Sequence, residues 1–157
     1  MENKIWFFNI ASTFALLVSI TSTFAAESTI TVETPWVRQV EAGMKNSAAY
    51  FTLKNSSDQS IDLLKVASQA AATVEIHNHV HLDGAMKMER VEKVTIAPKS
   101  SVEFKPMGYH VMLIGLSDSF KKDKKVALKL SFSDGSTRSI TAEKRGFDEH
   151  SSHSKHH

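Results

Sequence analysis

Short segments in which apolar and polar residues alternate with a period of two recur along most of this chain. The clearest are 73–82, 91–96 and 126–132, and Asp134-Gly135 is a hairpin turn signal. Successive side chains of a β-strand point to opposite faces, so this pattern predicts strands that bury one face. No run of ten or more residues beyond the N-terminal region has a helical period, although a helical turn is expected near 68–72. The pattern predicts an all-β sandwich or barrel. Further strands are expected at 29–32, 48–54, 61–66, 102–104, 109–116 and 136–142.

The N-terminal region has the features of a secretory signal peptide. Lys4 precedes an uncharged run from 5 to 26, and small residues occupy the −3 and −1 positions of a cleavage site after Ala25. We therefore expect residues 1–25 to be removed on export to the periplasm. The alternative is an uncleaved membrane anchor, because a run of 22 uncharged residues could span a bilayer. After cleavage no stable membrane insertion is expected.

The remaining chain is expected to form one β-sandwich domain at 26–146. A chain of this size can build a packed core without disulfide bonds or structural metal ions. The absence of cysteine excludes a disulfide framework and any site that needs a thiolate. The 19 Lys and Arg against 17 Asp and Glu give a net charge of +2 without a basic stripe. This charge pattern argues against nucleic acid as a partner.

One segment, 77–112, concentrates the side chains that can bind a soft metal ion. It contains every histidine outside the last eight residues and four of the five methionines other than the initiator. Imidazole and thioether are neutral nitrogen and sulfur donors, and together they suit Cu(I). These donors are His77, His79, His81, His110, Met86, Met88, Met107 and Met112.

Strand periodicity predicts which of these donors share a face. His77, His79 and His81 alternate with apolar residues, so they project from the same side of the 73–82 strand. His110 and Met112 are likewise two residues apart on the 109–116 strand. A metal site could therefore take its donors from both strands and from the segment after residue 84 that contains Met86 and Met88, here called the methionine segment. The donors would be two imidazoles and two thioethers. Methionine in a β protein usually fills the core, and this role is expected for Met44 and Met107.

The C-terminal segment 147–157 is polar and histidine-rich, which predicts a disordered tail. Imidazoles without thioethers suit Cu(II) or zinc, so we expect the tail to bind such an ion separately from the core site. Its histidines are His150, His153, His156 and His157.

The spacing of four of these donors matches the motif of the periplasmic PCu(A)C-type copper chaperones. Ten residues separate His77 from Met88, 21 residues separate Met88 from His110, and one residue separates His110 from Met112. The flanking stretches NSAAYFTLKN, HLDGAMKM and KPMGYHVMLIGL are similar to that family as well, and the resemblance covers roughly 29–142. It implies a cupredoxin-like (immunoglobulin-like) β-sandwich that binds Cu(I) through these four residues.

The resemblance also implies a partner. The family hands copper to the copper centre of a terminal oxidase, so the expected acceptor is cytochrome oxidase subunit II or an assembly factor. His79, His81 and Met86 are not motif positions and remain supporting or alternative donors.

Other classes of protein fit the sequence less well. A blue-copper electron carrier needs a cysteine thiolate, and thioether is a poor zinc ligand. An enzyme is not expected, because the chain has no G-x-S-x-G elbow, no Cys–His pair and no paired carboxylates near the histidines. Two alternatives stay open: a copper-sequestering or resistance protein without a delivery partner, and a secreted adhesion-type sandwich.

Overall fold

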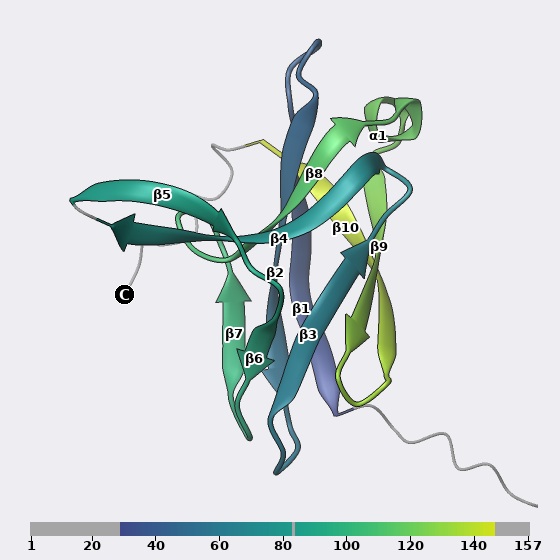
Figure 1. Cartoon of the computed structure of the whole chain (residues 1–157). Coiled ribbons are helices and arrows are strands. Elements are labelled where there is room, and N and C mark those ends of the chain that lie inside the picture. The colour runs from purple at the N-terminus through teal and green to yellow at the C-terminus, as the bar shows by residue number, and fades with distance from the viewer. Residues whose placement is uncertain (1–28, 83, 147–157) are drawn as a thin grey trace, which may run out of the picture.

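The computed structural model describes residues 29–82 and 84–146 (Figure 1). The predicted signal peptide and the predicted histidine-rich tail lie outside these residues. Within them, no helix is both long and apolar enough to cross a membrane. The elements are β1 (Ile30–Arg38), β2 (Asn46–Asn55), β3 (Ile61–Ala67), β4 (Ala71–Leu82), β5 (Ala85–Arg90), β6 (Val94–Ile96), β7 (Ser101–Phe104), β8 (His110–Leu116), α1 (Asp118–Lys122), β9 (Lys125–Phe132) and β10 (Thr137–Arg145).

The strands form one hydrogen-bonded path in the order β5-β4-β8-β2-β1-β10-β9-β3-β6, with β7 also paired to β2. β1 and β10 pair in parallel, and the other pairs along the path are antiparallel. The sheet curves over on itself, so that β3 contacts β4 and β6 contacts β2 around one core (Figure 1). This is the cupredoxin-like β-sandwich, and the all-β prediction is confirmed.

Period-two burial builds this core. In β9 the alternate residues Val126, Leu128, Leu130 and Phe132 are buried, and the residues between them are mostly exposed. β2 differs, because Ser47–Phe51 is buried without alternation. Two of its residues, Ala48 and Tyr50, form a second, small apolar cluster with Trp36, against which Met112 packs.

Several elements differ from the sequence prediction. β1 continues to Arg38 rather than ending at residue 32, because an irregularity in its pairing between Glu33 and Trp36 accommodates Pro35. The methionine segment is a full strand, β5, whereas only the last three residues of the predicted strand 91–96 remain a strand. The short helix α1 was not predicted, and the expected helical turn near 68–72 is a turn followed by the start of β4.

Met44 and Met107 do not fill the core, so that expectation was wrong. Their side chains are 47% and 62% exposed. Met107 has a φ of 66°, in the tight turn that joins β7 to β8, and no neighbouring strand covers such a turn. Met44 lies in the loop between β1 and β2.

A buried asparagine at the end of β2 joins three backbone segments. Asn55 is 1% exposed, and its Nδ2 donates to the carbonyls of Gln59, Ile96 and Ala97 at 2.7, 3.1 and 3.2 Å. Its Oδ1 accepts from the backbone N and the Oγ of Ser57 at 2.9 and 2.7 Å. All the hydrogen-bonding capacity of this amide is therefore used inside the protein.

Replacing Asn55 with alanine should lower the free energy of unfolding by about 2–4 kcal/mol, because all the hydrogen bonds of this buried amide are lost at once. Urea denaturation followed by circular dichroism measures this loss. The control is Ser56→Ala, whose exposed hydroxyl bonds to the carbonyl of Thr29; it should cost less than about 0.5 kcal/mol. Equal losses for the two variants would contradict a special role for Asn55.

Candidate metal centre

The potential metal ligands gather on the outer face formed by β5, β4 and β8, which lie side by side in this order. In the register of these strands His77 lies opposite His110, His79 opposite Met88, and His81 opposite Met86. Residues directly opposite each other in an antiparallel pair project to the same side. The expectation that these histidines share a face is therefore confirmed.

The closest contact among them joins His110 and Met88. The Nε2 of His110 lies 3.2 Å from the Sδ of Met88, and its Nδ1 lies 2.9 Å from the carbonyl oxygen of Gly108. A carbonyl only accepts, so Nδ1 carries the proton of the neutral ring. Burial lowers the pKa of His110, and the nearby His79 and His77 lower it further, which keeps the ring neutral near pH 7. The lone pairs of Nε2 and Sδ therefore face each other.

This nitrogen–sulfur pair has nearly the spacing that a shared metal ion needs. A metal bound tetrahedrally at about 2.0 Å from nitrogen and about 2.3 Å from sulfur holds the two donors about 3.5 Å apart. The observed separation of 3.2 Å is a few tenths of an ångström shorter. Met88 is 48% exposed and can adjust by side-chain rotation, whereas His110 is 3% exposed and held by its backbone bond.

His77 is oriented by a carboxylate. Its Nε2 lies 2.8 Å from Oε2 of Glu75, whose Oε1 lies 3.3 Å from a guanidinium nitrogen of Arg90. The hydrogen bond from His77, aided by the positive charge of Arg90, lowers the pKa of Glu75. A carboxylate accepts a hydrogen bond from the Nε2–H of His77, so the lone pair of the neutral ring lies on Nδ1. This Nδ1 is buried without a hydrogen-bond partner. Histidines that bind metals are commonly held in this way.

His79 lies closer to His110 than the motif residue His77 does. The ring centroids of His79 and His110 are 5.0 Å apart, against 5.9 Å for His77 and His110. The Nδ1 of His79 is also buried without a hydrogen-bond partner. The ring centroids of His77 and His79 thus both lie within 5.9 Å of that of His110, whose ring contacts Met88.

Met112 lies on the same face, two residues beyond His110, and opposite Glu75 in the register. It is partly buried against Trp36, Ala48 and Tyr50, and the rings of Trp36 and Tyr50 lie at a centroid distance of 4.3 Å, tilted by 32°. Sequence reasoning missed this aromatic pair, because it ended the first strand before Trp36. The one available signal was a tryptophan directly after a proline.

The outer part of the β4–β5 hairpin reaches away from the sandwich (Figure 1). His81 and Met86 lie there, two cross-strand pairs beyond His79 and Met88. The side chains of Leu82, Met86 and Met88 are 46%, 41% and 48% exposed. The described residues contain no cluster of three or more His, Cys, Asp or Glu arranged to hold a metal ion. A metal ion bound at the His110–Met88 pair would therefore require other donors to move toward it.

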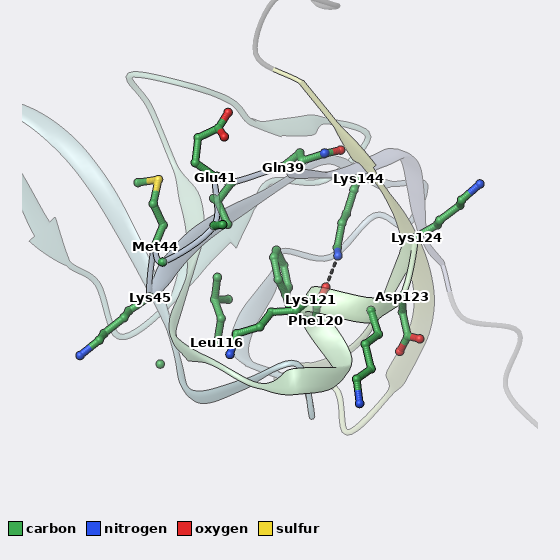
Figure 2. Close-up of a pocket in the computed structure, with 15 residues that line it drawn as sticks. Gln39, Glu41, Met44, Lys45, Leu116, Phe120, Lys121, Asp123, Lys124 and Lys144 are labelled. Atoms are coloured by element: carbon green, nitrogen blue, oxygen red, sulfur yellow. Dashed lines mark hydrogen bonds between the residues drawn. The ribbon is translucent and has the colours of Figure 1, made fainter.

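A large pocket lies at the opposite end of β8 from His110 (Figure 2). It has a volume of about 1000 Å³ and is lined by the 39–45 loop, the end of β8, α1 and Lys144. The Nζ of Lys144 donates to the carbonyl of Phe120 and lies 4.2 Å from the centre of its ring. Burial lowers the pKa of Lys144. The pocket lining includes none of the histidines, so this cavity is separate from the candidate metal centre.

The fold and this face together define a cupredoxin-like β-sandwich with imidazole and thioether donors on one outer surface. The chain belongs to the LpqE-like family, since the family model described as "Putative lipoprotein LpqE-like" matches residues 30–143. It is 29% identical over 119 residues to "Putative lipoprotein Lxx21020" of Leifsonia xyli subsp. xyli, covering 75% of this chain and 70% of the relative.

Several solved structures share the fold, and a PCuAC domain is among them. The apo PmoF2 PCuAC domain superposes with a TM-score of 0.64 at 26% identity, covering 77% of this chain and 93% of the domain. Apo-DR1885 from Deinococcus radiodurans superposes with a TM-score of 0.60 at 27% identity, covering 93% of this chain and 97% of that protein. The Cu(I) form of DR1885 gives a TM-score of 0.56 at 28% identity, covering 87% and 84%.

Proposed function

We propose that this protein is an exported copper chaperone that binds Cu(I) through His77, Met88, His110 and Met112. The observation that carries the proposal is the contact of 3.2 Å between the unprotonated Nε2 of His110 and the Sδ of Met88. Two neutral soft donors that face each other attract a soft cation, and Cu(I) accepts both nitrogen and thioether sulfur.

Two neighbouring side chains complete the proposed donor set. The Nδ1 of His77 is buried without a hydrogen-bond partner, while Glu75 holds the other ring nitrogen. Met112 is placed by its packing on Trp36 and Tyr50. The similar DR1885 has been solved with Cu(I), which supports copper as the metal. The lipoprotein names of the family and of the Leifsonia relative support export to the periplasm.

Exposure of the site supports a role in delivery. Met88 is 48% exposed on β5, a strand at the edge of the sheet, so an incoming ligand of another protein can reach the metal. The apolar side chains of Leu82 and Met86 on the same hairpin offer a contact surface beside it. We propose a terminal oxidase as the destination, through cytochrome oxidase subunit II or an assembly factor. Transfer of Cu(I) to a purified subunit II domain tests this step.

Titration with Cu(I) against a colorimetric chelator tests metal binding itself. The chain from residue 26 to 157 and a version that ends at residue 146 should each bind one equivalent of Cu(I). The longer version should bind one additional Cu(II), because only it carries the four histidines of segment 147–157. If the shorter version loses Cu(I), the tail completes the site, and if neither version binds Cu(I), the proposed function is wrong.

A further inference from the structure

His79 has the geometry of a metal ligand although it lies outside the four-residue motif. It pairs directly with Met88 across β4 and β5, and its ring lies 5.0 Å from that of His110. Its Nδ1 is buried and has no hydrogen-bond partner. A buried polar atom without a partner is destabilising, and a bound ion would remove that cost.

The ring separations can be compared with those of imidazoles on one metal. Two rings bound at about 2.0 Å, with an angle of 90–110° at the metal, have centroids roughly 4.5–5.2 Å apart. The 5.0 Å between His79 and His110 already falls in this range, and the 5.9 Å between His77 and His110 exceeds it by less than 1 Å. A small rotation of the His77 side chain would bring this third imidazole within the same range of the His110 ring.

We propose that His79 is a copper ligand and that His77, His79 and His110 together bind Cu(II) at the position where Cu(I) is bound with the methionines. The inference rests on the proposed function, since both oxidation states share His77 and His110. It adds a second donor set, in which His79 replaces the thioethers.

The ligand preferences of the two ions explain why Cu(I) and Cu(II) need different sets of donors. Cu(II) prefers nitrogen and oxygen in a square-planar or tetragonal arrangement, whereas Cu(I) accepts thioether sulfur. On the outer face His79 and Met88 are cross-strand neighbours, so a metal next to His110 can exchange one for the other without a change in the backbone. The protein can therefore take up copper in either oxidation state.

The test compares His79→Asn with His81→Asn. His81 is a matched control, because it lies on the same strand and face but is exposed and two cross-strand pairs farther along the hairpin. All proteins span residues 26–157, with the four histidines of segment 147–157 replaced by asparagine, so that Cu(II) at the tail does not obscure the result. Pulsed electron paramagnetic resonance counts the imidazoles bound to Cu(II), and competition titrations measure both affinities.

The parent and His81→Asn should show three imidazoles on Cu(II), and His79→Asn two. His79→Asn should weaken Cu(II) binding by about 10–100-fold or more, the loss typical even of groups that only support a ligand, and should change Cu(I) binding much less. Three imidazoles in His79→Asn, or equal losses in both variants, would overturn the role of His79 while leaving Cu(I) binding intact. A parent that binds no Cu(I) would overturn the proposed function as well.

Discussion

Replacing Met88 with leucine should lower the affinity for Cu(I) by about 100-fold or more, since even the loss of a supporting group around a metal typically costs 10–100-fold. The leucine keeps the apolar volume but has no sulfur to face the Nε2 of His110. Affinity for Cu(II), which prefers nitrogen and oxygen, should change little. Competition titrations with chelators for each oxidation state measure both affinities.

The stability of this variant should be nearly that of the parent protein. Met88 is 48% exposed, and exchange of methionine for leucine usually costs less than about 1.5 kcal/mol even in a core. The control is Met107→Leu, because Met107 lies 62% exposed in the turn before β8. Met112→Leu should act as Met88→Leu does. If Met88→Leu and Met112→Leu bind Cu(I) as tightly as the parent, the thioethers are not ligands.

Periodicity was sufficient to predict the faces of the strands in this protein. In β4 and β8 one set of alternate residues is largely apolar and faces the core, which sends His77, His79 and His110 to the other side. On β8 the alternate residues Val111 and Leu113 are fully buried in the core. A burial pattern of this kind is local, so the sequence of one strand reveals it.

The distances between the donors could not be predicted in the same way. They depend on which residues of β4 lie opposite β5 and β8, and this register follows from turn geometry and from the packing of the whole sheet. The spacing motif favours His77, and the register places His77 opposite His110, but the ring of His79 lies nearer to that of His110. The role of Trp36 beside Met112 was missed for a related reason, since the irregularity in β1 interrupts the alternation.

His110→Asn should weaken the binding of both Cu(I) and Cu(II). Met88→Leu, in contrast, should weaken mainly Cu(I) binding, and His79→Asn mainly Cu(II) binding. His110 contacts Met88 and lies within 5.9 Å, between ring centroids, of both other imidazoles, so it belongs to both proposed donor sets. Each affinity should fall by about 100-fold or more, because a direct ligand is lost in each case.

Asparagine is chosen because its amide nitrogen can take the place of Nδ1 and still donate to the carbonyl of Gly108. The variant should therefore keep the turn before β8, and its free energy of unfolding should fall by no more than about 1–2 kcal/mol, a usual cost for one substitution. Urea denaturation checks the fold, and the two competition titrations check the metals. A folded His110→Asn protein that binds both ions like its parent would place the copper ligands elsewhere in the chain. If it loses Cu(I) alone, Cu(II) is held without His110, and the two ions do not share a site.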